Sequence, residues 1–259
     1  MNSMSLLQNL FQNLILKVSR IKTRFLKNLL INLFKNHYKI SLEEFARKNV
    51  DEYSSFNDFF TREFKDGVRP IDQTEKTIVS PVDGKVMESG MVSDGKLFQL
   101  KNMEYNLSNL LNKNPKLIEA FKNAFYLTIY LAPYNYHRVH LPYQGKLLNN
   151  QIIGGKTYKV NEQALKKINA LYTKNTRQIS HFESSRFNYC MIMVGAMNVA
   201  SISITDKSKD IYNKGEEFAC FNLGSTVLLL FSNSENIKIP VNLRFGEKIK
   251  LGECIAKFR

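Results

Sequence analysis

An uninterrupted apolar run, Val227–Phe231, lies near the C-terminal end of the chain, directly after Gly224, Ser225 and Thr226. A short apolar run of this kind is typical of a strand that is buried inside a sheet. The Gly-Ser pair at its entrance has two interpretations. The first is an ordinary turn, because glycine tolerates positive φ and serine caps or bends the backbone. The second is a reactive serine, and the rest of the chain has to decide between them.

Short strand patterns dominate the chain after residue 76. Segments rich in β-branched and aromatic residues predict strands at Thr77–Ser80, Lys85–Met87, Ala124–Leu131, Met191–Val194, Val199–Ile204, Thr226–Phe231 and Ile237–Val241. Helices are expected to start at Ser41 and Ser55 and to cover Leu107–Leu111, Pro115–Asn123 and Glu162–Tyr172. Residues 245–256 are typical of a last hairpin. No linker divides residues 50–259, so we expect an α+β fold, a single β-rich core domain after a helical N-terminal region.

The net charge of +14 is placed unevenly along the 259 residues. Residues 1–42 hold seven Lys and Arg and no Asp or Glu, and therefore carry half of that charge. This asymmetry predicts an anionic partner, either a membrane surface or a nucleic acid. The three cysteines are scattered without CxxC spacing, so neither a disulfide framework nor a metal site is predicted, and a reducing compartment fits.

Large apolar residues recur with helical spacing through residues 6–34, with basic residues between them. No stretch approaches the roughly 20 apolar residues that span a bilayer, and no secretory cleavage site is evident. We expect one or two amphipathic helices in the lipid interface, with Lys and Arg at anionic headgroups. The alternative is a helical hairpin packed on the body. Nucleic acid is not expected as a partner, because the basic residues alternate with large aliphatic ones and no nucleic-acid-binding motif occurs.

Two further segments favour a reactive serine over a turn. One is Ser80–Lys85 (SPVDGK) and the other is Tyr136–Pro142 (YHRVHLP). A serine hydroxyl is a weak nucleophile until an imidazole removes its proton, and a carboxylate assists by fixing the imidazole tautomer. We therefore expect Asp83, His140 and Ser225 to act together as the catalytic acid, base and hydroxyl.

These segments resemble the membrane-associated, self-processing phosphatidylserine decarboxylase family. The resemblance runs from about Tyr53 to Arg259. It is carried, in chain order, by residues 55–63 (SFNDFFTRE), 67–70 (GVRP), 80–85, 136–142, 194–199 (VGAMNV), 214–217 (KGEE) and 223–226 (LGST). Each piece alone is a weak signal, whereas all of them in this order are specific.

The resemblance implies a precursor that cleaves itself between Gly224 and Ser225. The Ser225 hydroxyl attacks the Gly224 carbonyl and converts the amide to an ester, with His140 as the base and Asp83 behind it. β-Elimination then separates the long chain, residues 1–224, from the short chain, residues 225–259. The two chains would stay together as a heterodimer, alone or as a dimer of heterodimers.

The covalent cofactor implied by the resemblance is a pyruvoyl group derived from Ser225. It forms a Schiff base with the amine of phosphatidylserine and takes up the electrons left by CO2, so that phosphatidylethanolamine is released. His137 is the candidate for substrate binding and proton transfer, with packing as its alternative role. If its segment is a strand, His137 and His140 point to opposite faces.

The resemblance also implies an organisation in space. Residues 1–48 would be the basic, membrane-associating helical region and residues 49–259 the catalytic domain. The protein would be peripheral on the cytoplasmic face of the cell membrane, with anionic lipids and phosphatidylserine as its partners.

Several polar residues have open roles. Relatives commonly have Asp where this chain has Asn135, which keeps the hydrogen bonding but loses the charge. Arg62, Lys65 and Arg69 are candidates for contacts with phosphate headgroups, with solvated surface charge as the alternative. His181 is expected in a polar loop without a special role.

Two other functions compete with the decarboxylase. One is a serine hydrolase that uses Asp83, His140 and Ser225 on a lipid or ester without self-cleavage, although the chain lacks the Gly-x-Ser-x-Gly elbow. The other is a non-catalytic basic membrane-binding protein. Of the three, the decarboxylase alone predicts a 225–259 fragment on a denaturing gel.

Overall fold

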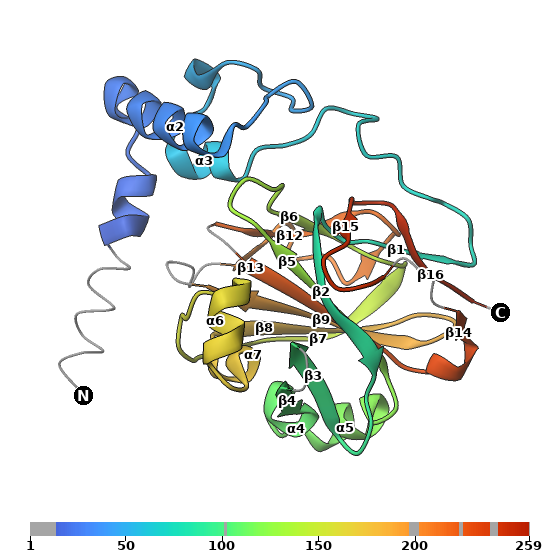
Figure 1. Ribbon diagram of the computed structural model, residues 1–259. Helices are drawn as coiled ribbons and strands as arrows, with labels where there is room; N and C mark the ends of the chain where they lie inside the picture. Colours follow the sequence, from blue (N-terminus) through green and yellow to red (C-terminus); the bar gives the residue numbers. More distant parts are fainter. Residues whose placement is uncertain (1–13, 101–102, 197–201, 223–224, 239–242, 259) are drawn as a thin grey trace.

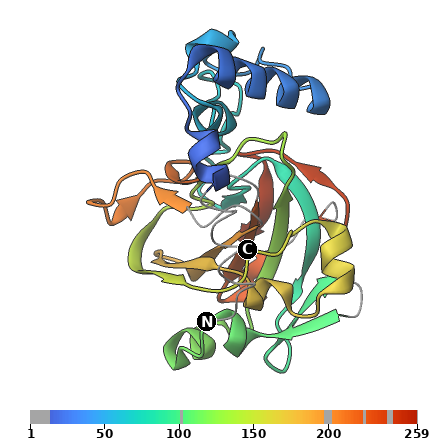
Figure 2. The ribbon, with the colours of Figure 1, turned by 90° about the vertical axis from the view of Figure 1, so that its left-hand side faces the viewer.

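The computed structural model describes residues 14–100, 103–196, 202–222, 225–238 and 243–258. Figures 1 and 2 show a β-rich body with a helical lobe above one end of it. The largest sheet is antiparallel, with the order β11-β7-β8-β9-β13-β5-β2-β15. In that order its strands are Ile211–Tyr212, Gly145–Ile153, Arg177–Glu183, Asn188–Gly195, Ser225–Phe231, Phe125–Leu131, Gly84–Met91 and Lys248–Ile249.

Strand β13 lies inside this sheet, between β9 and β5. Its side chains alternate between two cores. Val227, Leu229 and Phe231 pack on one face of the sheet, and Leu228 and Leu230 pack on the other. All five are fully buried, which stabilises the fold by about 1.5–3 kcal/mol per side chain. The strand predicted from the apolar run is therefore confirmed, and residue 225 opens it.

Smaller sheets share the two cores on the faces of the large sheet. They are β1-β16-β14 (Thr77–Val79, Cys254–Phe258 and Ile237–Lys238), β10-β12-β6 (Ile202–Ile204, Glu217–Phe221 and Arg138–His140) and β3-β4 (Lys96–Leu100 and Met103–Asn106). The hairpin expected within residues 245–256 is wrong, because β15 pairs with β2 whereas β16 pairs with β1 and β14. His181, expected in a loop, lies in β8 with its ring edge-on to Phe121.

Short helices cover the second core. They are α4 (Leu107–Leu110), α5 (Pro115–Phe121), α6 (Glu162–Lys167) and α7 (Leu171–Lys174). The side chains of Asn106 and Asn114 cap α4 and α5 by accepting backbone N–H groups, as N-cap residues do. The predicted helix Glu162–Tyr172 is interrupted, because Ile168 is extended and Ala170 has a φ of 51°.

The helical lobe consists of α2 (Arg24–Tyr38), η1 (Val50–Glu52) and α3 (Phe56–Phe60), and a second 3-10 turn, η2 (Ser234–Asn236), lies in the body. The start predicted at Ser55 is confirmed, since its hydroxyl accepts the Asp58 N–H at 3.1 Å. The helix predicted at Ser41 is wrong. That segment turns instead, and Phe45 pairs with Phe64. The observed α+β architecture with a helical N-terminal region confirms the predicted fold class.

Candidate active site

Ser225 is the first residue of β13. Its backbone lies between Leu131 of β5 and Gly195 of β9. The other half of the predicted cleavage site, Gly224, lies outside the described residues. A short link, residues 222–224, joins the end of β12 at Phe221 to Ser225. The predicted cleavage site is therefore at the entrance of a strand that is held on both sides by neighbours.

The two histidines of interest lie beside the chain that leads into β13. His140 ends β6 and His137 directly precedes this strand. Strand β6 pairs with β12 below the helical lobe, and the Phe221 N–H donates to the His137 carbonyl at 2.9 Å. The chain thus passes His137 four residues before it reaches Ser225.

The turn that carries Asp83 lies against His140. The backbone N–H of His140 donates to the Pro81 carbonyl at 2.9 Å. Directly after Asp83, Gly84 opens β2, and a Cβ at this position would lie only 2.5 Å from the Ile129 side chain. Glycine therefore lets the turn approach β5 closely, next to His140.

His140 is half-buried, and both ring nitrogens have hydrogen-bond partners. Nδ1 lies 2.8 Å from the Gly215 carbonyl, which can only accept, so Nδ1 carries the hydrogen. Nε2 lies 2.9 Å from the Tyr136 hydroxyl, which then donates to it. Gly215 has a φ of 76°, and a Cβ there would lie 2.7 Å from Ile71, so the carbonyl that sets this tautomer depends on glycine. Burial lowers the pKa of His140 and favours its neutral, basic form.

Asp83 is held by a guanidinium group and by the backbone. Arg69 Nη2 lies 2.7 Å from Asp83 Oδ2, Arg69 Nε lies 3.0 Å from Oδ1, and the Leu251 N–H donates to Oδ1 at 2.8 Å. Arg69 also binds Glu44 at 2.9 Å. The guanidinium that was a candidate for contacts with phosphate headgroups is therefore already paired with two carboxylates. Within the described residues Asp83 makes no hydrogen bond to His140, although its charge opposes the lowering of the His140 pKa by burial.

His137 is fully buried. Its Nδ1 lies 2.9 Å from the Asn135 carbonyl and therefore carries the hydrogen, and its ring packs on Phe60 with centroids 4.0 Å apart. Nε2 presents a lone pair and has no hydrogen-bond partner in the described part of the chain. Burial and, second, the charge of Arg62 lower the pKa of His137 to about 3. Because β6 begins at Arg138, the strand alternation considered for the two histidines does not apply.

Sequence reasoning placed Arg62 differently from the structure, whereas Asn135 keeps the hydrogen bonding expected of it. Arg62 is fully buried and donates to the carbonyls of Tyr134 and Asn135 at 2.6 and 3.3 Å, so its proposed contact with headgroups is wrong. In the sequence, Phe59 and Phe60 lie shortly before Arg62, and they are the feature from which its burial could have been predicted. The Asn135 side chain accepts the Ala132 N–H at 2.8 Å. This position therefore stabilises a turn, which needs an oxygen atom rather than a charge.

A cavity of about 260 Å³ lies between the helical lobe and these residues. Its walls are formed by Tyr38, Lys39, Ile40, Ser41, Glu44, Phe45, Phe64, Arg69, Asp83, Tyr134, Asn135 and Tyr136. The cavity therefore gives access to Asp83 and to Tyr136, the hydrogen-bond partner of His140. Among the described residues no group of His, Cys, Asp or Glu is suited to holding a metal ion.

Helix α2 has apolar side chains on two sides. Ile31 is buried against the lobe, with Leu30 and Phe34 half-buried beside it. Phe25, Leu29 and Leu33 are instead 75%, 46% and 60% exposed. These last three follow one another at intervals of four residues and form one stripe, which we call the outer stripe of α2. The predicted amphipathic pattern is thus divided between a packed face and an exposed apolar one.

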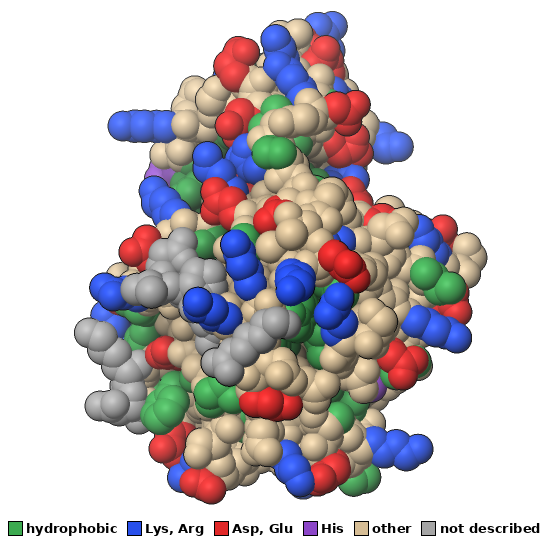
Figure 3. Space-filling model, turned by 90° about the vertical axis from the view of Figure 1, so that its right-hand side faces the viewer, with side chains coloured by type: hydrophobic (Ala, Val, Ile, Leu, Met, Phe, Trp, Pro, Cys, Tyr) green, Lys and Arg blue, Asp and Glu red, His purple; other side chains and the backbone are tan. Residues whose placement is uncertain are grey.

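The basic residues of the N-terminal region are only partly available to a membrane. Lys27 is buried, and its Nζ donates to the Val50 carbonyl at 3.3 Å, while Arg24 pairs with Asp51 at 3.0 Å. Lys17, Arg20, Lys22 and Lys39 are exposed. In the body, basic and acidic side chains are interspersed over most of the face seen in Figure 3.

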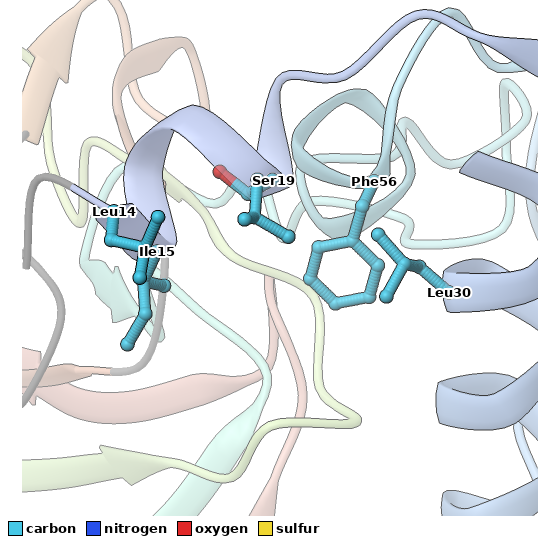
Figure 4. A pocket seen from close by; sticks show the side chains of 6 residues that line it. Leu14, Ile15, Ser19, Leu30 and Phe56 are labelled. Atoms are coloured by element: carbon cyan, nitrogen blue, oxygen red, sulfur yellow. The ribbon is translucent and has the colours of Figure 1, made fainter. Parts of the chain in front are cut away.

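A second cavity, of about 240 Å³, lies in the N-terminal region and is apolar. It is lined by Leu14, Ile15, Val18, Ser19, Leu30 and Phe56 (Figure 4). Its walls come from the helical segment 14–19, from α2 and from α3. None of the helices within the described ranges is long and apolar enough to cross a membrane.

Comparisons with known proteins show the family of this chain. The family model for phosphatidylserine decarboxylase matches residues 56–257. The chain is 36% identical to the phosphatidylserine decarboxylase proenzyme of Saccharophagus degradans, over 92% of each chain. It is 32% identical to that of Psychrobacter arcticus, over 93% of this chain and 94% of the relative. It is 36% identical to that of Acinetobacter baumannii, over 88% and 84%. The chain therefore belongs to the phosphatidylserine decarboxylase family.

Proposed function

We propose that this chain decarboxylates phosphatidylserine to phosphatidylethanolamine with a pyruvoyl group that it makes by cleaving itself between Gly224 and Ser225. The observation that carries the proposal is the position of residue 225, at the entrance of the central strand of a sheet in a chain of this family. The relatives are named as proenzymes, which agrees with a precursor.

In the self-cleavage step the Ser225 oxygen adds to the Gly224 carbonyl carbon while the hydroxyl proton goes to a base. His140 is the proposed base. Its Nδ1–H is fixed by the Gly215 carbonyl, so the basic lone pair is on Nε2, which takes the proton when the Tyr136 hydroxyl turns away. Asp83 would support the resulting imidazolium with its negative charge, which opposes the lowering of the His140 pKa by burial.

The rest of the cleavage follows from the ester. The Cα proton of residue 225 is removed, the Cβ–O bond breaks, and Gly224 leaves as a free carboxylate. Water then converts the dehydroalanine to the ketone and ammonia. Within the body, β13, β14, β15 and β16 would all belong to the short chain, and each pairs with strands of the long chain or with one another. The two chains would therefore stay associated after cleavage.

The residues around position 225 fit a pyruvoyl group. His137 Nε2 is a buried polar atom without a partner among the described residues, and the His137 backbone lies beside the chain that leads into residue 225, so this nitrogen is available for a substrate there. The pyruvoyl group would supply a ketone that captures the substrate amine and accepts the electron pair released with CO2. His137 would meet the substrate carboxylate and handle the proton that replaces CO2, while the buried rings around it exclude water.

The function is tested by CO2 release from phosphatidylserine in detergent micelles. We expect activity without added pyridoxal phosphate and in the presence of a chelator, because the electron sink is covalent. Hydroxylamine, or borohydride in the presence of substrate, should abolish it by attacking the ketone or its imine. Full dependence on pyridoxal phosphate would contradict the pyruvoyl mechanism, and ester hydrolysis without CO2 release would favour the serine hydrolase.

We further propose that the protein is peripheral on the cytoplasmic face of the cell membrane, with the outer stripe of α2 in the lipid interface. Three large apolar side chains on one exposed helix face are costly in water and suit an interface. The exposed basic residues of the N-terminal region would add attraction to anionic lipid, which salt screens.

Replacing Leu29 and Leu33 together by serine should release the protein from vesicles that contain anionic lipid. If each leucine contributes about 1.5 kcal/mol, binding weakens roughly 100-fold. The measurement is co-sedimentation with vesicles at low and high salt. Asn32→Ser is the matched control, because Asn32 is exposed on the same helix but is polar. Equal binding of the double variant and the control would show that another surface holds the membrane.

A further inference from the structure

Arg62 is a buried cation without a carboxylate partner in the described structure. It is fully buried, and its hydrogen bonds go to three backbone carbonyls, those of Phe59, Tyr134 and Asn135. Phenylalanine rings lie on the guanidinium, with centroids 4.4 and 5.1 Å from Cζ. Carbonyl dipoles and rings stabilise the cation but leave its charge in place.

The neighbouring arginines are different. Arg69 is paired with Asp83 and Glu44, and Arg138 is paired with Glu63 and Glu217. Among the described arginines of the site, Arg62 therefore keeps an uncompensated positive charge. A buried charge of this kind is costly and calls for a function.

Arg62 shares a hydrogen-bond acceptor with His137. The Asn135 carbonyl accepts from Arg62 Nη2 at 3.3 Å and from His137 Nδ1 at 2.9 Å, so the guanidinium and the imidazole share one acceptor. Arg62 also ties residues 134 and 135 to the end of α3 through the Phe59 carbonyl. Its position thus sets where the Asn135 carbonyl lies, and the carbonyl sets the tautomer of His137.

We propose that Arg62 is a positioning residue for decarboxylation, which holds His137 neutral with Nε2 unprotonated until the substrate carboxylate arrives. This inference rests on the proposed function. The carboxylate brings a negative charge next to the pair, so His137 takes a proton from solvent at Nε2 and donates it to the carboxylate as a hydrogen bond. Substrate binding is thereby coupled to proton uptake.

The positive charge of Arg62 then favours release of the proton from His137. When the C–C bond breaks, CO2 leaves as a neutral molecule and its electron pair stays behind. The imidazolium again faces the positive charge of Arg62 alone, which makes it a strong acid. Its Nε2 proton forms the new C–H bond, and His137 returns to the neutral form. One proton is consumed and one CO2 is released, as the net reaction requires.

The charges around His137 support this assignment. Burial and Arg62 lower the pKa of His137, and the hydrogen bond to the Asn135 carbonyl opposes them. Among the residues that the structure describes, the other neighbours add no charge: Phe60 presents a ring, and β12 presents the Phe221 N–H to the His137 carbonyl. Arg138, the next residue in the chain, is neutralised by its two glutamates.

The test is a ¹⁵N-histidine NMR titration of the uncleaved Ser225→Ala protein, which needs no decarboxylase activity. With Arg62 present, His137 should stay neutral with Nδ1 protonated from neutral to mildly acidic pH. Arg62→Met should raise the His137 pKa by about one to two units, because a nearby like charge has been removed. Arg62→Lys, which keeps the charge, should not. A His137 pKa that is equal in the Met and Lys variants would overturn the proposal.

Kinetics supply the second readout in cleaved enzyme. Arg62→Met should lower kcat about 10-fold, because the His137 imidazolium is a weaker acid, and should move the pH limb of the kcat profile upward. Arg62→Gln is the second neutral variant and retains an amide donor for the carbonyls if the methionine variant does not fold. Loss of activity with an unmoved pH limb in both neutral variants would mean that Arg62 only packs. If the wild type cleaves but releases no CO2, the proposed function fails while the NMR result stands.

Discussion

Replacing Ser225 by alanine should leave a single chain of about 30.0 kDa and abolish decarboxylation. Without the hydroxyl nothing can attack the Gly224 carbonyl, and no ketone can form at residue 225. Wild-type protein should instead give chains 1–224 and 225–259 on a denaturing gel, and these should co-elute in native buffer because β13 is held between β5 and β9. Intact mass spectrometry and native size exclusion provide the measurements.

Ser232→Ala is the matched control for this experiment. Ser232 lies just beyond the other end of β13, and its hydroxyl accepts the Asn188 N–H at 2.9 Å, so its loss perturbs the same strand without touching the proposed cleavage site. The control should cleave normally. Cleavage of the Ser225→Ala protein at this bond would refute self-cleavage by Ser225. A wild type that hydrolyses esters as one intact chain would favour the serine hydrolase.

The central strand could be predicted from sequence because burial on both faces requires a continuous apolar run. Strands β7 and β8 could not, because β7 has no fully buried position and the buried positions of β8 include polar side chains. Gln178 and Ser180 both donate to Asn150 Oδ1, at 2.7 and 3.0 Å. A buried polar group costs little when its partner is in place. An apolar pattern therefore misses strands whose polar residues satisfy one another.

The wrong helix at Ser41 has a related cause. Its first turn has the acidic residues that favour a helix start. The backbone of this segment instead pairs with a distant one, since the Lys65 N–H donates to the Glu44 carbonyl and the Ala46 N–H donates to the Glu63 carbonyl. Tertiary hydrogen bonds outweigh a local preference worth only a few tenths of a kcal/mol to about 1 kcal/mol.

In the candidate site, too, some groups could be predicted from the sequence and others could not. The proposed acid, base and hydroxyl carry chemistry in their side chains, so their residue types and order indicate them. The groups that orient these side chains are not indicated by residue type. His140 is oriented by the carbonyl of Gly215, 75 residues away, and His137 by the carbonyl of Asn135. A backbone carbonyl has no sequence signature, so only the fold reveals which residue provides it.

The two histidines should separate cleavage from decarboxylation. His140→Ala should slow self-cleavage by roughly 10²–10⁴-fold, the usual contribution of a general base, and leave mostly precursor. Asp83→Ala should slow it in the same direction. His137→Ala should still cleave, at least in part, because His137 is assigned to the substrate, yet its decarboxylation should fall by about 100-fold or more. Gel densitometry over time and CO2 release from the cleaved fraction measure the two steps separately.

The lowered pKa of His140 predicts how the rate of self-cleavage depends on pH. Burial lowers the pKa of His140, so the neutral base should persist below the ordinary histidine pKa of about 6.5. Cleavage should therefore stay constant from neutral into mildly acidic pH and fall only further down. His181→Ala is the control, since His181 is also half-buried and packs on a phenylalanine but lies in β8. Cleavage lost in His137→Ala and kept in His140→Ala would mean that the two roles are reversed. Within the described ranges His137 Nε2 has no partner, whereas Nε2 of His140 binds Tyr136, so the reversal would assign Ser225 activation to the buried histidine.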